Sequence, residues 1–382
     1  MRMNKSQDVL KIIEKYRNKD FTFSSGHILG SMCTQPHPIA NKAYMKFLDT
    51  NLGDPGLFPG SIELEIEYCK FLSNLLNAPR SSGHVVGSGG TESNINAIWL
   101  AKKLSGKNEI IIPGSAHFSF EKIASLMDIK LVPINLTKEY IMDISEVKRK
   151  ISKNTLAVVG IAGSTELGTI DSIPELGEMC LDENVFFHVD AAFGGYVIPF
   201  LKKLNYKVSD FDFKIKGVSS ISIDAHKMGC SAIPLGTLIV RHNKWLESIS
   251  VESHCVSSET QSGILGTRSG GPVAAAYAVS KYLGMDGYKA IVKQCMDNTY
   301  YLEERLEDIG LDPVVKPTMN VIGIKLKKPD MIAKKLSDRG WKVNIMKRVS
   351  SIRIVVMPHV KRNTIDEFIP VLKKVCKDNK EI

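Results

Sequence analysis

The chain has 382 residues, of which 43% are hydrophobic, and a formal net charge of +9. This length predicts two or three domains, and the lack of any run of about 20 apolar residues argues against a membrane-spanning helix. The amino-terminal segment 1–16 is charged and amphipathic and lacks the apolar stretch of a signal peptide. Seven scattered cysteines without a C-x-x-C pair favour a reducing cytoplasm over a disulfide framework or a zinc site.

The positive charge is compatible with an anionic partner such as a nucleic acid. The basic residues, however, are spread along the chain in short pairs such as Lys202-Lys203 and Lys334-Lys335. Such pairs are typical of solvated helix faces, whereas nucleic-acid binding needs a clustered basic patch. We therefore expect neither a nucleic acid nor a membrane as partner.

The amino-terminal part is predicted to form one helix, at 6–18, followed by long loops. Five apolar side chains recur there at helical spacing: Val9, Leu10, Ile12, Ile13 and Tyr16. The stretch 26–60 is rich in Gly, Pro and Asn but also holds Leu and Phe. This mixture is typical of an ordered functional loop rather than a flexible linker, and His37 and Asn51 within it are candidates for contact with a substrate.

A regular alternation of helices and strands follows. Helices are predicted at about 62–76, 92–103 and 118–127. Strands are predicted at 84–86, 109–112, 130–134, 155–161, 185–189 and 218–223. Strands that alternate with helices are typical of a mostly parallel α/β sheet with helices on both faces.

The pattern changes after residue 271. A long helix is predicted at 273–306, with a break near 284–287, and it leads into a smaller β-α-β-α arrangement that ends at Lys377. We therefore expect three parts: an amino-terminal helix with substrate-lining loops (1–60), a large α/β domain (61–271) and a small carboxyl-terminal domain (272–382).

Lys227 follows the predicted strand at 218–223, in the run Asp224-Ala225-His226-Lys227. A lysine just past a buried strand is partly desolvated, which lowers its pKa and frees the neutral amine that reacts with aldehydes. A lysine in a surface loop is the alternative, and exposure statistics favour it for any lysine considered alone. The groups at neighbouring strand ends argue for the first interpretation, because an open α/β sheet binds its ligand at that edge.

Two of these groups match a flat, phosphorylated ligand. The run from Gly87 to Thr91 precedes a helix, and glycines and free N–H groups at a helix start attract phosphate; a simple tight turn is the alternative. It matches no nucleotide-binding motif. Asp190 ends a very apolar strand and needs a cationic partner such as a protonated ring nitrogen, unless it caps the next helix.

Two further side chains follow neighbouring strands. His117 is placed either to stack on a planar ligand or to serve as a core histidine, and Thr165 could hydrogen-bond a phenolic oxygen. A phosphate cradle, a stacking imidazole, a strand-end aspartate and a strand-end lysine are together what pyridoxal 5'-phosphate requires. The sequence therefore predicts this cofactor.

On these motifs the chain resembles the fold-type I enzymes of the group II decarboxylase family, and in particular archaeal members that act on L-tyrosine and L-aspartate. The resemblance extends over nearly the whole chain, and it is strongest in 51–58, 116–122, 165–171, 188–200 and 353–359. It implies an α/β fold of the aspartate-aminotransferase type, with a mostly parallel large domain that binds the cofactor and a smaller α+β carboxyl-terminal domain.

The resemblance also implies individual roles. Cofactor contacts are expected from Gly90, Thr91, His117, Thr165, Asp190, His226, Lys227 and Thr267. Lys227 is expected to bind the aldehyde and Asp190 the ring nitrogen. Thr267 is expected to reach the phosphate from a second subunit, which implies a homodimer with shared active sites. Arg353 is expected to bind a substrate carboxylate, with a surface ion pair as the alternative.

One segment departs from the family pattern. Its members carry a tyrosine on a mobile loop before the Gly-Thr-Arg segment, where it returns a proton to the substrate carbon. The corresponding residues 251–260 contain no tyrosine, and His254 is the nearest replacement acid.

The implied reaction is decarboxylation of an L-amino acid. Conversion of L-tyrosine to tyramine would serve methanofuran synthesis, and conversion of L-aspartate to β-alanine would serve coenzyme A synthesis. A carbon–carbon lyase of the sphingosine-phosphate-lyase type and a tRNA-dependent enzyme with the same cofactor are the alternatives.

Overall fold

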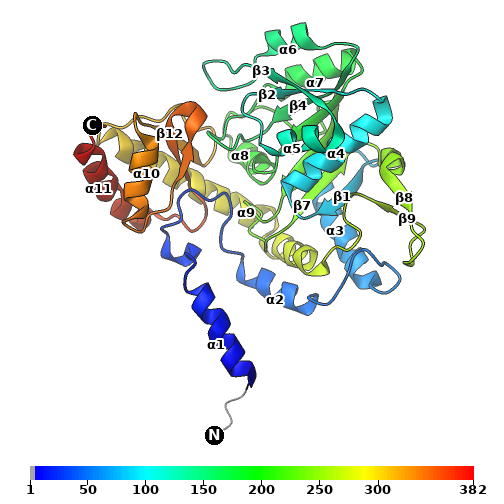
Figure 1. The fold of residues 1–382 in the computed structure, drawn as a ribbon, viewed down its shortest axis with the longest axis horizontal. Coiled ribbons are helices and arrows are strands. Elements are labelled where there is room, and N and C mark those ends of the chain that lie inside the picture. The colour runs from blue at the N-terminus through cyan, green and yellow to red at the C-terminus, as the bar shows by residue number, and fades with distance from the viewer. Residues whose placement is uncertain (1–4) are drawn as a thin grey trace.

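A seven-stranded sheet forms the centre of the larger part of the computed structural model, which describes residues 5–382 (Figure 1). The strand order is β1-β7-β6-β5-β4-β2-β3. The strands are β1 (Gly83–Gly87), β2 (Glu109–Pro113), β3 (Lys130–Ile134), β4 (Thr155–Ile161), β5 (Phe186–Asp190), β6 (Val218–Asp224) and β7 (Gly236–Val240). Only β7 runs antiparallel to its neighbours, so the predicted mostly parallel sheet is confirmed.

Helices cover both faces of this sheet, as predicted. They are α3 (Pro59–Leu75), α4 (Gly90–Ser105), α5 (Ser119–Met127), α6 (Ile144–Lys150), α7 (Ile173–Asp182) and α8 (Ile198–Lys203). Alternate residues of β7 belong to different buried clusters, since Leu238 and Val240 pack in one and Ile239 in another. A strand buried on both sides in this way needs apolar side chains at successive positions, which the central strands provide.

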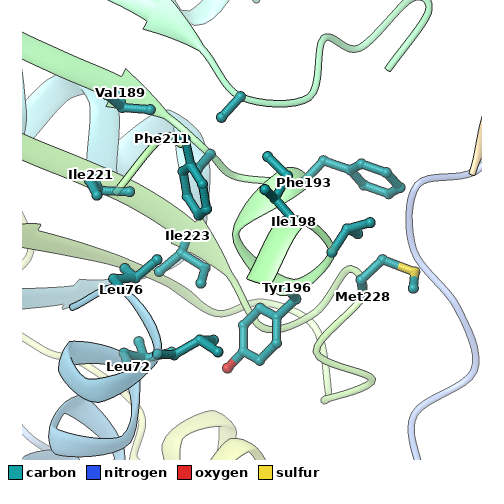
Figure 2. Close-up of a cluster of buried hydrophobic side chains, with 14 of the residues drawn as sticks. Leu72, Leu76, Val189, Phe193, Tyr196, Ile198, Phe211, Ile221, Ile223 and Met228 are labelled. Atoms are coloured by element: carbon teal, nitrogen blue, oxygen red, sulfur yellow. The ribbon is translucent and has the colours of Figure 1, made fainter. Parts of the chain in front are cut away.

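The largest buried cluster lies beneath the carboxyl ends of β5 and β6 (Figure 2). Ile221 and Ile223 of β6 pack there with Tyr196 and with Leu72 of α3. The hydroxyl groups of Tyr68 and Tyr196 are 3.0 Å apart, so each has a partner although both rings are buried. This packing holds the ends of the two strands that carry Asp190 and Lys227.

The amino-terminal part contains α1 (Lys5–Arg17), η1 (Phe23–Ser25) and α2 (Pro38–Lys46). The predicted first helix is confirmed, but its apolar side chains remain exposed and Figure 1 shows it projecting from the body. The predicted loop-rich stretch 26–60 also contains α2, which was not predicted from the sequence. Pro38 suits the first helical position, and His37 accepts a hydrogen bond from Ile39 N at 3.3 Å as the helix cap.

The carboxyl-terminal part is built on α9 (Gly270–Glu307), which contributes to both large cores. The predicted break is confirmed at Gly284, where φ is 56°. The remaining elements are β10 (Val321–Lys325), α10 (Pro329–Ser337), β11 (Asn344–Met346), η4 (Lys347–Val349), β12 (Ser351–Val355) and α11 (Arg362–Asp378). The predicted β-α-β-α arrangement missed β11, a three-residue strand at the edge of the antiparallel sheet β10-β12-β11.

A short hairpin of β8 (Ser250–Glu252) and β9 (Thr260–Ser262) follows η3 (Asn243–Ile249), and η2 (Gly194–Tyr196) follows β5. Within residues 5–382, no helix has the length and apolar character needed to cross a membrane. The predicted division of the chain at residues 60 and 271 stays a prediction.

Candidate active site

A cavity of about 330 Å³ lies at the carboxyl edge of the large sheet. It lies where β1, β2, β4, β5 and β6 end, because parallel strands place their ends on one side. Most of the residues predicted to contact the cofactor line it: Gly90, Thr91, His117, Thr165, Asp190, His226 and Lys227. Segments more than 130 residues apart in the sequence therefore meet at one site, and the volume falls within the range of small-molecule pockets.

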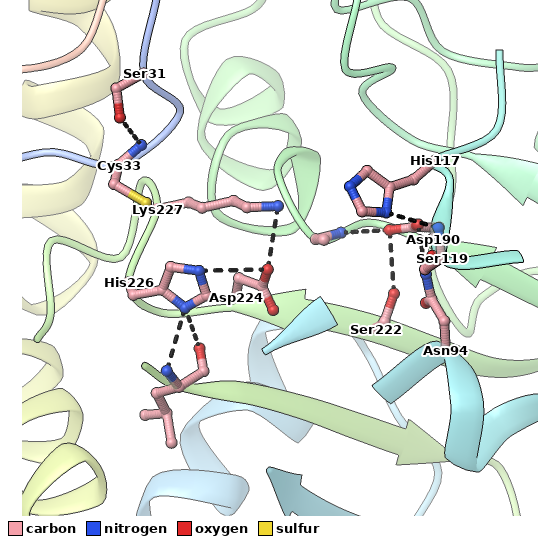
Figure 3. A network of polar contacts seen from close by, with 12 residues as sticks. Ser31, Cys33, Asn94, His117, Ser119, Asp190, Ser222, Asp224, His226 and Lys227 are labelled. Carbon is pink, nitrogen blue, oxygen red and sulfur yellow. Dashed lines mark hydrogen bonds and ion pairs between the residues drawn. The ribbon is translucent and has the colours of Figure 1, made fainter. Parts of the chain in front are cut away.

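Lys227 forms an ion pair with Asp224 (Figure 3), whose Oδ2 lies 3.1 Å from Lys227 Nζ. Burial by itself lowers the pKa of Lys227, but attraction by Asp224 and then by Asp190 outweighs it and raises the pKa above its usual value. The predicted lowering by desolvation is therefore wrong for the protein without its cofactor. A strand-end lysine was expected to face an apolar surrounding, whereas two carboxylates face it.

Asp190 accepts hydrogen bonds on both carboxylate oxygens (Figure 3). Ala192 N and Ser222 Oγ donate to Oδ1 at 3.1 and 3.2 Å, and Asn94 Nδ2 donates to Oδ2 at 2.9 Å. Hydrogen bonds of this kind favour the charged form of a carboxylate. The buried Asp190 carboxylate is thus held in one orientation on the wall of the cavity, where a ring nitrogen could meet it.

A buried histidine supports this arrangement from behind. His188 Nε2 lies 3.0 Å from Asn94 Oδ1, and its Nδ1 lies 2.8 Å from Ser220 Oγ. Burial lowers the pKa of His188 to about 4, so its ring is neutral at physiological pH. A neutral ring that donates from Nε2 orients the Asn94 amide so that its NH₂ group points at Asp190.

The glycine-rich turn before α4 forms the part of the cavity wall where a phosphate would lie. Gly89 has φ of 144°, a value that residues with a side chain rarely adopt. A Cβ atom at Gly90 would lie 3.0 Å from Asp224 Oδ2 and 3.1 Å from Ala192 Cβ, so only glycine leaves this space free. The first N–H groups of α4 have no partner within the helix and are available to an anion.

His117 and Thr165 also line the cavity. Ser119 N donates to His117 Nδ1 at 3.2 Å, which fixes the ring. Burial lowers the pKa of His117, although the charge of Asp190 opposes the change. A neutral, oriented imidazole is suited to stacking on a flat ring.

Several predicted residues lie outside the lining of this cavity as the described residues form it. Arg353 donates to the carbonyl oxygens of Thr165 and Gly30, both at 2.5 Å, and its Nε is buried without a partner. Asn51 Oδ1 accepts from Gly53 N at 2.8 Å and from Arg268 N at 3.1 Å. Both side chains thus brace the backbone, and their substrate roles, like that of His37, stay predictions.

Two predicted residues of the segment after β7 also lie outside the lining of the main cavity. Thr267 lines a separate cavity of about 120 Å³ that also borders Gly87 and Ser88. His254 is exposed between β8 and β9. In a single chain neither residue lines the main cavity.

Sequence reasoning missed Asp224, Asn94 and Ser222 as parts of the site. Asp224 could have been identified from the sequence, because a carboxylate at the end of a strand is the same pattern that identified Asp190. No sequence pattern identifies Asn94, because its contact with Asp190 joins residues that are 96 positions apart.

These observations fit pyridoxal 5'-phosphate. Lys227 provides an amine, Asp190 an anion for the ring nitrogen, and the Gly89–Gly90 turn a space that a Cβ atom would fill. The side chains of the cavity therefore match the chemical groups of the cofactor.

Comparisons with known proteins agree with this arrangement. The sequence model of the pyridoxal-dependent decarboxylase conserved domain matches residues 50–322. The L-aspartate decarboxylase of Thermococcus kodakarensis is 46% identical over 97% of both chains. The probable L-tyrosine/L-aspartate decarboxylase of Methanosphaera stadtmanae is 43% identical over 98% of both. The solved sphingosine-1-phosphate lyase of Burkholderia pseudomallei has the same fold, with a TM-score of 0.90 at 24% identity, over 99% of this chain and 91% of that one.

Proposed function

Because this chain belongs to the pyridoxal-dependent decarboxylase family, we propose that it converts L-aspartate to β-alanine with release of CO₂. Its cofactor is pyridoxal 5'-phosphate, and its reaction class is the decarboxylation of an L-amino acid. The observation that carries the proposal is the convergence of Lys227, Asp190 and His117 on one cavity that the glycine turn at the start of α4 also lines. The choice of aspartate is supported by relatives that match nearly the whole chain.

Different side chains of the cavity have different roles in this reaction. When bound, the cofactor supplies an electron sink for the electron pair left by the departing carboxylate. Asp190 would favour a proton on the ring nitrogen, because its hydrogen bonds hold the carboxylate in place on the cavity wall. Lys227 offers the amine that would hold the aldehyde of the cofactor. His117 lines the cavity, where its imidazole would stack on the cofactor ring.

Arg353 is proposed to bind a substrate carboxylate, with help from His37 and Asn51. Its unpaired Nε supports this role, and Thr165, to which it donates, lines the cavity. His254 is proposed to return the proton to the substrate carbon. Since it lies on an exposed hairpin, it would act at the cavity of a second subunit.

L-Tyrosine is the second candidate substrate. Four large apolar side chains line the cavity and would accept an aromatic ring: Met32, Phe118, Ile161 and Phe193. Tyramine would then be the product, for methanofuran synthesis, whereas β-alanine would supply coenzyme A synthesis. The likeness to the sphingosine-1-phosphate lyase concerns the fold alone and does not support a carbon–carbon lyase.

Incubation of the purified protein and pyridoxal 5'-phosphate with single amino acids tests the proposal. We expect L-aspartate to yield CO₂ and β-alanine in equal amounts, and to be preferred over L-tyrosine and L-glutamate. Chromatography of the amine and trapping of CO₂ measure both products. Tyramine as the main product would favour the second candidate, and an absence of CO₂ from all three amino acids would contradict decarboxylation.

A homodimer is proposed as the active unit, in which Thr267 of the partner subunit completes the phosphate site. The exposed apolar face of α1 supports this assembly: Leu10 is 63% and Tyr16 66% exposed in the single chain. All seven cysteines are free, which supports a reducing cytoplasm as the location.

We expect sedimentation at assay concentration to show a dimer, and deletion of residues 1–17 to weaken it, because the apolar face of α1 would lose its cover. Replacement of Thr267 by Val should raise the cofactor dissociation constant by about tenfold, the effect of losing one hydrogen bond to a charged group. Full activity of a monomer would refute the shared site.

A further inference from the structure

Asp224 is a second buried carboxylate at the site, beside the one that faces the ring nitrogen. It is the last residue of β6 and is 2% exposed. Its Oδ2 accepts from Lys227 Nζ at 3.1 Å, while its Oδ1 is buried without a hydrogen-bond partner. A buried carboxylate with one unpaired oxygen is energetically unfavourable. The ion pair with Lys227 is therefore a candidate for a functional contact.

The surroundings hold Asp224 tightly in place. A Cβ atom at Gly236 would lie 2.6 Å from Oδ1, and one at Gly90 would lie 3.0 Å from Oδ2. His226 Nε2 lies 3.8 Å from Oδ2. The carboxylate is therefore wedged between the start of β7 and the glycine turn of α4, and its Oδ2 is directed at Lys227 (Figure 3).

The charged and titratable groups that face Lys227 come from four parts of the chain. Asp224 and His226 lie on its own segment, Asp190 ends β5, His117 follows β2, and Cys33 belongs to the amino-terminal loop. Of these, Asp224 makes the direct contact with Nζ. The two carboxylates together favour the ammonium form of the lysine.

We propose that Asp224 is a positioning residue that holds the amino group of Lys227, as the ammonium ion, at the cavity wall whenever this group is not bonded to the cofactor. It thereby sets the pH at which the amine becomes reactive. The ammonium ion must release a proton to solvent before the amine can attack the aldehyde, and formation of the carbon–nitrogen double bond then expels one water. The inference rests on the proposed role of Lys227 and adds a residue to it.

The test measures how fast Lys227 of the cofactor-free protein is labelled by pyridoxal 5'-phosphate and cyanoborohydride across a pH series. Peptide mass spectrometry locates the label. We expect Asp224→Asn to lower the pH midpoint of labelling by about one unit, which makes labelling at neutral pH about tenfold faster. A parallel series with pyridoxal, which lacks the phosphate, should show the same shift, because the effect is on the amine and not on phosphate binding.

Asp212→Asn is the matched control. Asp212 is also a buried aspartate, but its carboxylate accepts from Asn77 Nδ2 and Lys214 N, away from the cavity. This variant should leave the midpoint unchanged. An unshifted midpoint in Asp224→Asn would overturn the inference, whereas absence of label from Lys227 in the unmodified protein would overturn the proposed function instead.

The unmodified protein offers a test that does not depend on the folding of a variant. If Asp224 holds the ammonium ion, the midpoint for the natural chain must lie at or above the usual lysine value of about 10.4. A midpoint below this value would contradict the inference, whatever the variant does.

Discussion

Replacement of Lys227 by alanine is expected to lower turnover by roughly 10⁴-fold or more, since a residue that forms the covalent link cannot be replaced by its neighbours. The same change leaves Asp224 buried without its cation. We therefore expect this variant also to lose roughly 3 kcal/mol of unfolding free energy, the lower end of the range for a broken buried ion pair.

Lys227→Arg separates the two effects. A guanidinium keeps a positive charge near Asp224 but does not form the bond to an aldehyde, so this variant should be inactive and retain more stability than Lys227→Ala. Borohydride reduction should place the cofactor on Lys227 of the natural chain and on neither variant. Lys70→Ala, which changes an exposed lysine paired with Glu67, is the control and should remain fully active. Label on another lysine would contradict the assignment.

Replacement of Asp190 by asparagine is expected to lower kcat by roughly 10²–10³-fold, the usual effect of removing one oriented electrostatic group from a catalytic site. Asparagine has nearly the same shape but no charge, so it no longer favours a proton on the ring nitrogen. Ser222 and Ala192 can still donate to its one oxygen, whereas its NH₂ group would face that of Asn94. The amide of Asn94 would have to turn and would lose its contact with His188.

Steady-state kinetics and cofactor titration measure this effect, with Asp212→Asn again as the control. The control should keep its kcat, because Asn77 can turn its amide to accept from the new side chain. A small loss of affinity with a large loss of kcat is the expected signature. If Asp190→Asn kept its full kcat, the carboxylate would not be the partner of the ring nitrogen.

The sequence by itself determined six of the seven strands of the large sheet, all but β7, and the main residues at its reactive edge. Runs such as 156–161 contain only apolar residues and glycine and are flanked by turn residues, and this is a local property. Asp190 and Lys227 could be placed because parallel strands bring their carboxyl ends to one edge whatever the details of packing. The chemistry of an aspartate, a lysine and a glycine turn at that edge then indicated the cofactor.

Only the tertiary structure decided what surrounds these groups. The antiparallel strand β7 lies between β1 and β6, and its pairing joins residues that are far apart in the chain. The pKa of Lys227 is raised rather than lowered, because Asp224 and Asp190 both face its amine. Asn94 reaches Asp190 from the first turns of α4, and Arg353 reaches the backbone of Thr165 from β12. Each of these depends on distances between separate elements, and it is the packing of the elements, more than local composition, that sets how strongly a buried charge is stabilised.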